Sequence, residues 1–280
     1  MRSLSTDMDT TAVSRGRLAV RRGVPVPRLL RTTVLVLALS LAATPTQATS
    51  HEEPEGMNTK TSLPDAAEAL TPRQKAIVPI AAFAAAGDID KLTAALNEGL
   101  DIGLTISEVR EILVQLYAYA GFPRSLNALG ALMKVVDTRK QARLRDADGS
   151  APGRQVPTGD ALLVAGTANQ TKLSGGPVKG ALFDFAPAID RFLKTHLFGD
   201  IFERDNLDWQ SRELATVSML AALTGVDSQL QAHMRISMNV GLSAGQLKQL
   251  CEVLVDRVDR QAARRADEAL ERQLVAATGH

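Results

Sequence analysis

The chain of 280 residues is poor in cysteine and in aromatic residues. Its one cysteine, Cys251, excludes an internal disulfide framework and a cysteine-rich metal site. It contains only two Tyr, one Trp and seven Phe, and alternating runs of β-branched residues are few. Because such alternation marks half-buried strands, its scarcity in a chain rich in Ala and Leu predicts an all-α protein.

Motifs of several functional classes are missing as well. No glycine-rich phosphate loop follows a predicted strand, and neither His-Glu-x-x-His nor Cys-x-x-Cys spacing occurs. The chain after residue 48 carries no basic stripe of the kind that binds nucleic acid. We therefore expect no cofactor, no metal ion and no nucleic-acid partner.

The charge of the chain is unevenly divided. Residues 1–48 hold seven Arg and two Asp, a net charge of +5, whereas residues 49–280 carry a net charge of −4. The Arg residues precede an apolar run, residues 33–43, and small residues follow it at 46–48. This order is typical of a secretory signal peptide, and the run is too short for a transmembrane helix. We expect export to the periplasm or the exterior without a membrane anchor, although an uncleaved anchor, and the choice between Sec and twin-arginine export, stay open.

Composition divides the rest of the chain into four parts. Residues 49–63 are polar and are predicted to be a flexible mature N-terminus. Residues 64–140 and 181–275 are predicted helical repeats, and residues 141–180, rich in Gly, Pro, Asp and Ser, are a predicted connector with one short helix. Five of the seven Phe lie in residues 183–202, and their spacing favours a helix packed on the core.

The strongest organisational signal is a set of chain breaks and helix caps that recurs 138 residues later. The matched pairs are Gly87 with Gly225, Gly103-Leu104-Thr105 with Gly241-Leu242-Ser243, and the capping pair Thr105 and Glu108 with Ser243 and Gln246. Several landmarks at one offset are typical of an internal duplication. The sequence therefore predicts two tandem copies of one helical unit.

The most promising chemical groups lie in residues 212–243. This stretch is predicted to form two helices that are separated by a break at Gly225. Glu213 opens the first helix and His233 lies in the middle of the second. Packing of the two apolar faces would bring this acid and this base together in a dry environment.

These residues resemble the repeat of the carboxymuconolactone decarboxylase and alkyl hydroperoxidase D superfamily. The resemblance rests on Arg212-Glu213-Leu214, on His233, on Asn239-Val240-Gly241-Leu242-Ser243, and on the segment that contains Tyr119-Ala120-Gly121-Phe122-Pro123. It covers residues 71–272 and implies a tandem duplicated helical bundle of the alkyl hydroperoxidase D type. The hydroperoxidase branch also needs a Cys-x-x-Cys pair, and this chain has Val226 and Gln229 in those places.

The resemblance implies a role for each matched residue. His233 would be a general acid in lactone-acid decarboxylation, with Glu213 holding the tautomer of its ring. Arg212 or Asn239 would stabilise the oxyanion that develops in the reaction. Tyr119, from the first copy, would form a wall of the same substrate site. The first copy has Lys and Ala where the second has the acid and the base, so one site per chain is expected.

A second histidine candidate, His196, precedes the second repeat in a His-Leu-Phe-Gly segment that resembles those of secreted tandem relatives. The candidates also have structural interpretations. His233 would suit a core histidine, Glu213 would favour the dipole at a helix start, and Arg212 could pair with a neighbouring acid. His196 could donate to a backbone carbonyl, and Cys251 could be a small buried hydrophobe.

We therefore expect an enzyme that resembles carboxymuconolactone decarboxylase, acts on a small carboxylated or lactone substrate without a cofactor, and forms a homo-oligomer. One alternative is a peroxide-related antioxidant protein. Dithiol peroxidase chemistry is disfavoured because Val226 and Gln229 replace the thiols. The other alternative is a non-catalytic helical binding or scaffold protein.

Overall fold

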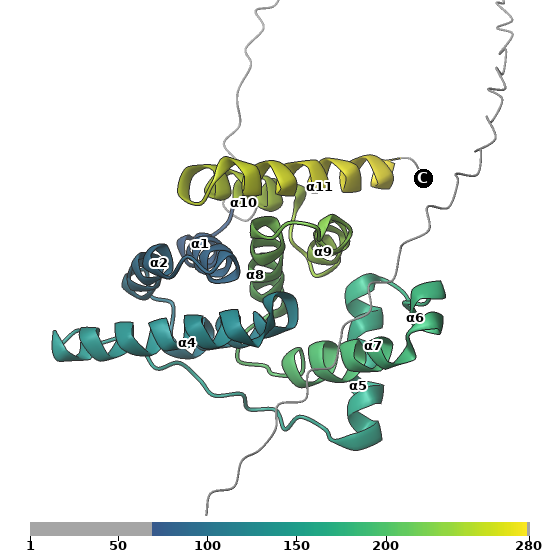
Figure 1. Cartoon of the computed structure of the whole chain (residues 1–280), viewed down its shortest axis with the longest axis horizontal. Helices are drawn as coiled ribbons and strands as arrows, with labels where there is room; N and C mark the ends of the chain where they lie inside the picture. The colour runs from purple at the N-terminus through teal and green to yellow at the C-terminus, as the bar shows by residue number, and fades with distance from the viewer. Residues whose placement is uncertain (1–68, 279–280) are drawn as a thin grey trace, which may run out of the picture. The chain divides into compact units, whose positions relative to one another are not determined.

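The computed structural model describes residues 69–278, which form helices and no strand (Figure 1). The predicted all-α class is confirmed. The predicted signal peptide, residues 1–48, and the predicted flexible segment, residues 49–63, lie outside the described residues and stay predictions. Within residues 69–278, no helix has both the length and the apolarity that crossing a bilayer requires.

Within the described residues, each copy contains four helices, and a third group of helices lies between the copies in the chain. The first copy contains α1 (Pro72–Ala86), α2 (Ile89–Asp101), α3 (Ile106–Gln115) and α4 (Tyr117–Gln141). The second contains α8 (Trp209–Ala222), α9 (Asp227–Asn239), α10 (Ala244–Arg257) and α11 (Arg260–Thr278). Between them lie α5 (Gly159–Ser174), α6 (Ala181–Phe185), α7 (Pro187–Phe192) and a π-helix, η2 (Leu193–Ile201).

The third helix of each copy begins with the same capping chemistry. The backbone N–H of Glu108 donates to the Thr105 hydroxyl over 3.2 Å, and the Thr105 N–H donates back to the Glu108 carboxylate over 2.7 Å. Ser243 and Gln246 make the same reciprocal pair at the start of α10. Since such a cap is worth about 1 kcal/mol, it fixes where a helix begins. Both predicted capping boxes are confirmed.

The chain breaks of the two copies share a backbone conformation. Gly103 and Gly241 have φ angles of 98° and 97°, in the left-handed region that a Cβ disfavours. A further matched break was not predicted. The helix α4 is interrupted at Gly121, and the position 138 residues later, Asp259, separates α10 from α11. The predicted duplication is therefore confirmed in the backbone.

The core is built around the first helix of each copy. Both α1 and α8 are buried along most of their length, and they pack against each other. In the first copy α2 and α4 cover α1, and in the second α9 and α11 cover α8 (Figure 1). Ile80 and Leu214 are fully buried, and burying a side chain of this size contributes about 1.5–3 kcal/mol. The two copies therefore share one core.

The predicted connector contains the whole of α5, a helix of 16 residues that packs on η2 and on α9. The contact with η2 is very close, because a Cβ atom added at Gly166 would lie 1.7 Å from the carbonyl oxygen of Lys194. Leu173 of α5, Phe198 of η2 and Ile236 of α9 share a second apolar cluster. This segment therefore forms part of the folded structure beside the second copy.

The single helix predicted over residues 183–202 is wrong in its first half. The chain leaves the helical conformation at Ala186, where Pro187 follows and disfavours helical angles in the residue before it. Phe198 is buried with the core as expected. In contrast, Phe185 and Phe192 are 88% and 54% exposed. Packing on the core therefore explains only the second half of the Phe-rich segment.

Candidate functional site

The structure brings the predicted glutamate and histidine into contact. The loop of residues 223–226 joins α8 to α9, and the two helices pack together, so their facing sides meet. His233 Nδ1 lies 2.7 Å from Glu213 Oε2. The exposed fractions of Glu213 and His233 are 0% and 7%. A carboxylate that accepts a hydrogen bond from Nδ1–H fixes the tautomer of the ring and leaves Nε2 to exchange a proton with a substrate.

Polar atoms near this pair are buried without a hydrogen-bond partner among the described residues. They include Glu213 Oε1, the Tyr119 hydroxyl and Ser237 Oγ. Tyr119 approaches the His233 ring edge-on, with ring centroids 5.5 Å apart, and Ser237 lies one helical turn after His233. An unsatisfied buried polar atom costs about 1–3 kcal/mol. A ligand that makes hydrogen bonds here would therefore recover binding energy.

Tyr119 is the contribution of the first copy to this site. It lies in the first turn of α4, just before the break at Gly121. Its ring is partly exposed, but its hydroxyl is buried. Burial, followed by the charge of Glu213, raises the pKa of Tyr119 above its ordinary value of 10, and an interaction with Thr216 offsets part of this. The hydroxyl therefore stays protonated at neutral pH and is available as a hydrogen-bond donor.

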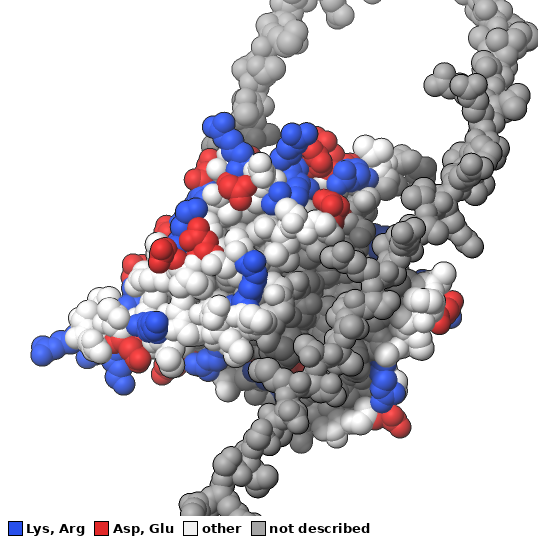
Figure 2. Space-filling view, viewed as in Figure 1, with Lys and Arg blue, Asp and Glu red and all other residues white. Residues whose placement is uncertain are grey.

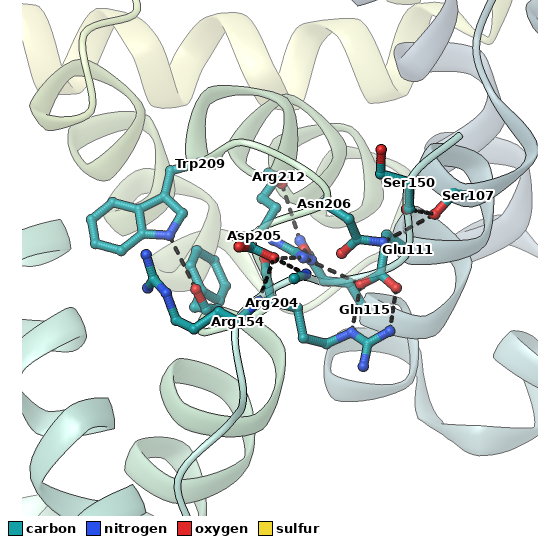
Figure 3. A network of polar contacts seen from close by, with 12 residues as sticks. Ser107, Glu111, Gln115, Ser150, Arg154, Arg204, Asp205, Asn206, Trp209 and Arg212 are labelled. Atoms are coloured by element: carbon teal, nitrogen blue, oxygen red, sulfur yellow. Dashed lines mark hydrogen bonds and ion pairs between the residues drawn. The ribbon is translucent and has the colours of Figure 1, made fainter. Parts of the chain in front are cut away.

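Arg212, the residue before the glutamate, binds across the interface between the copies (Figure 3). Its guanidinium is fully buried and donates from Nη2 to Glu111 Oε2 over 3.2 Å and from Nη1 to Gln115 Oε1 over 3.1 Å. Nη2 also donates to the backbone carbonyl of Arg204 over 2.9 Å. Only Nε lacks a partner within the described part of the chain. The arrangement matches the structural interpretation of Arg212, pairing with a neighbouring acid.

Glu111 is the centre of this network. Its carboxylate accepts two hydrogen bonds from the Arg204 side chain, over 2.8 and 2.6 Å, besides the one from Arg212. Burial works to raise the pKa of Glu111, but the bonds and charges of its polar neighbours outweigh burial and lower it. Burial lowers the pKa of Arg212, and the charge of Glu111 opposes that change. The two buried charges therefore depend on each other.

The sequence analysis missed Glu111, Gln115 and Arg204. A local signal existed for the first two, since they are polar residues one turn apart on α3 and only apolar residues, 112–114, lie between them. The partner Arg204 is 93 positions away from Glu111 in the chain, so no local pattern indicated it.

Two other predicted residues are bound elsewhere. Asn239, at the end of α9, donates from Nδ2 to the carbonyl of Leu173 over 2.9 Å and so joins α9 to α5. His196 lies on η2, where its Nδ1 is 2.8 Å from Asp200 Oδ2 and its side chain is 59% exposed. The structure therefore groups Glu213, His233 and Tyr119, and the predicted functional roles of Asn239, His196 and Arg212 stay predictions.

The cysteine of the described residues and the positions of the missing cysteine pair lie on different helices. Val226 and Gln229 lie at the start of α9 where the hydroperoxidase branch has its two cysteines. Cys251 is buried on α10, and burial, with the charges of Asp267 and Glu252, raises its pKa to about 12. Among residues 69–278, no three His, Cys, Asp or Glu side chains gather as a metal site would require.

Fold and site together define a class: a helical protein built from two tandem copies, whose described part holds one buried histidine–glutamate pair beside a tyrosine from the other copy. The model of the carboxymuconolactone decarboxylase family matches residues 57–134 and again residues 187–272. The chain belongs to the carboxymuconolactone decarboxylase family, with one match for each copy. A search of curated proteins found no match.

Proposed function

We propose that this protein catalyses a cofactor-free decarboxylation, or a related proton transfer on a lactone or acid, of a small carboxylated substrate. The observation that carries the proposal is the 2.7 Å contact between His233 Nδ1 and Glu213 Oε2 in a buried site. Family membership supports a protein of the carboxymuconolactone decarboxylase type and makes decarboxylation the first reaction to test.

In the proposed reaction the bond between the carboxylate carbon and the adjoining carbon breaks, and carbon dioxide leaves. The electron pair of that bond moves into a conjugated carbonyl group of the substrate. The protonated ring of His233 then donates its Nε2 proton to the carbon, so that the carboxylate and one proton become carbon dioxide and product. Glu213 keeps Nδ1 protonated throughout, and solvent restores the lost proton. A positioned general acid contributes about 10²–10⁴-fold to a rate.

The carbonyl oxygen that receives the electron pair needs a hydrogen-bond donor. We assign this role to Tyr119, whose hydroxyl is buried, protonated and without a partner among the described residues. In a site that excludes water, such a donor is worth about 10²–10³-fold in rate. The proposal does not need Arg212 for this role, because Glu111 and Gln115 already bind its guanidinium.

The test is release of carbon dioxide from a panel of small carboxylated lactones and unsaturated or β-keto acids. We expect turnover of at least one member by the native protein. His233→Asn should lower kcat by about 10²–10⁴-fold, and Glu213→Gln should also lower it, while the far-ultraviolet circular dichroism of both variants stays native. The matched control is His196→Asn, which changes a histidine that does not contact Glu213 and should leave kcat unchanged.

Three results would contradict the proposal. Binding of panel members without any turnover would favour the non-catalytic helical binder. Equal rates for the native protein and His233→Asn would place the chemistry elsewhere. Turnover of hydroperoxides with a dithiol donor, abolished by Cys251→Ser, would favour the antioxidant alternative.

A further inference from the structure

A second cluster of polar and apolar groups surrounds His196. A pocket of about 280 Å³ lies between the start of α4 and the helices α7 and η2. Ile189, Phe192, Leu193 and Leu197 supply its apolar surface, and Tyr117 and His196 supply its polar groups. Glu213, His233 and Tyr119 are not among its lining residues, so the pocket is distinct from the candidate active site.

The polar groups of this pocket have defined roles. Asp200 Oδ2 lies 2.8 Å from His196 Nδ1. When the imidazole is neutral, the Asp200 carboxylate accepts a hydrogen bond from Nδ1–H. The other ring nitrogen, Nε2, is then a hydrogen-bond acceptor. Burial and the nearby charge of Asp200 raise the pKa of Tyr117, so its hydroxyl remains a donor. The pocket therefore offers one acceptor and one donor.

Several contacts hold these groups in place. The Tyr117 ring is stacked on Phe122, with centroids 4.6 Å apart and planes at 9°. The ring centroids of Phe192 and His196 lie 6.1 Å apart with the ring planes at 41°, so the two rings are neighbours in the pocket lining. Leu197 is buried and anchors η2 in the second apolar cluster. The histidine sits within a π-helix, a rare conformation that is found frequently at functional sites.

The lining determines the chemistry of a ligand. None of the lining residues is Lys or Arg, and the carboxylate of Asp200 is close by, so an anion is disfavoured. Phe192 and Ile189 are 54% and 46% exposed, and an apolar ring would cover them. The volume lies just below the ~300–1,000 Å³ of sites for drug-sized ligands. A molecule with one ring is therefore the best match.

We infer that this pocket is a binding site for a small neutral phenol, whose ring lies against Phe192 and Tyr117 and whose hydroxyl donates to His196 Nε2. The Tyr117 hydroxyl donates to the phenolic oxygen. This site differs in ligand charge from the proposed active site, which takes a carboxylated substrate, and it does not depend on that proposal.

The test compares three ligands with the same ring and methyl group: p-cresol, toluene and 4-methylbenzoate. Binding to the purified protein is measured by nuclear magnetic resonance titration at about pH 8, where histidine in model peptides is neutral. We expect p-cresol to bind more tightly than toluene by roughly three- to tenfold for each of its two hydrogen bonds. The carboxylate should bind most weakly. Equal affinities for p-cresol and toluene, or tightest binding of 4-methylbenzoate, would overturn the inference.

Variants separate this pocket from other sites. His196→Leu keeps apolar bulk but removes the acceptor, so the preference for p-cresol over toluene should fall by roughly three- to tenfold. When Tyr117→Phe is added, the donor is lost as well, and the two ligands should bind equally. Phe192→Ala should weaken the binding of both p-cresol and toluene. The matched controls are Phe185→Ala, which removes an exposed Phe that does not line the pocket, and His233→Gln, which alters the active site. Neither control should change the affinity for p-cresol. A preference for p-cresol that is unchanged in His196→Leu, or that is lost in His233→Gln, would show that the phenol binds elsewhere.

Discussion

The two copies share their chain breaks and helix caps but differ in their buried polar residues. Both have a left-handed glycine before the third helix, both have a capping box after it, and both have a break 18 residues after that glycine position, at Gly121 and Asp259. Yet the position of buried Glu213 is occupied in the first copy by exposed Lys75, and the position of His233 is occupied by Ala95. The shared helical scaffold therefore does not require the histidine–glutamate pair.

The first copy instead supplies what the second lacks. Glu111 and Tyr119 come from the first copy, and the equivalent positions in the second are Gln249 and Arg257. Arg257 pairs with Glu98 at the surface and does not enter a buried site. The groups that meet beside His233 thus come from both copies, which supports our proposal that one site is shared between two diverged copies. The predictions below test this division.

The largest effect is expected at the buried ion pair. Glu111→Ala would leave the Arg212 guanidinium buried without its charged partner and should lower the free energy of unfolding by about 3–5 kcal/mol. The matched control is Gln249→Ala at the equivalent position, whose side chain accepts one bond from the backbone of Leu70. It should cost less than about 1.5 kcal/mol. Urea unfolding measures the free energy of unfolding of both variants. Equal losses would contradict the proposal that the two copies have different buried polar roles.

The sequence predicted much of the fold because its signals are local. Capping residues and left-handed glycines act within one turn, so the helix starts at Thr105 and Ser243 were readable without tertiary information. The contact between Glu213 and His233 was predictable because a short loop joins their helices and the family motif pairs them. The bonds between Arg204 and Glu111 depend on how distant segments pack, which no local pattern encodes.

The exposed half of the Phe-rich segment shows the same limit. The spacing of Phe residues predicted burial, but spacing cannot say whether anything covers the face it creates. Pro187 in the sequence indicated that the helix would end at Ala186, but the spacing of the Phe residues favoured a continuous helix. The π-helix η2 also has no sequence signature of its own, because its close packing on Gly166 depends on a helix from another part of the chain.

A second prediction concerns the tyrosine of the first copy. Tyr119→Phe removes a buried hydroxyl that has no partner in the described residues, so the free energy of unfolding should stay the same or rise slightly. Turnover should fall by about 10²-fold, because the proposed oxyanion donor is lost. Tyr117→Phe, two residues earlier, is the control and should keep native turnover. Steady-state kinetics on the best panel substrate would decide, and equal turnover of the two variants would remove Tyr119 from the site.

A third prediction tests whether the segment between the copies is integral to the fold. Gly166→Ala places a Cβ against the Lys194 carbonyl, so α5 and η2 must separate at a cost of about 1–3 kcal/mol. The control is Gly130→Ala on α4, where an added Cβ meets nothing within 4 Å. That change should stabilise the protein by about 0.4–1 kcal/mol. Thermal unfolding shows whether each variant is more or less stable than the native protein. If Gly166→Ala does not change the stability, the contact between α5 and η2 is loose.

A fourth prediction concerns acid. The pKa of Glu111 is lowered in the folded protein, so the unfolded chain takes up a proton first as the pH falls below the ordinary value of 4.5. The stability that this carboxylate contributes should therefore be complete above that pH and should be lost as the pH falls toward the lowered pKa. Glu111→Gln should be less stable at neutral pH, with a flatter acid limb in urea unfolding. An unchanged acid limb would show that other carboxylates dominate.

The smallest effect is expected from rebuilding the pair in the first copy. Lys75→Glu with Ala95→His, placed in a His233→Asn background, should restore no turnover. Lys75 is exposed, and Arg257 stands where a second tyrosine would be needed. The assay is carbon dioxide release on the best panel substrate. Recovered activity would mean that either copy can hold a whole site.

The central claim, one site assembled from both copies, is tested most directly by a double-mutant cycle on kcat/KM with Tyr119→Phe and His233→Asn. If both residues act on the same transition state, the loss in the double variant should be clearly smaller than the sum of the two single losses, expressed as free energies. Additive losses would mean that the tyrosine of the first copy and the histidine of the second act independently, and would contradict the shared site.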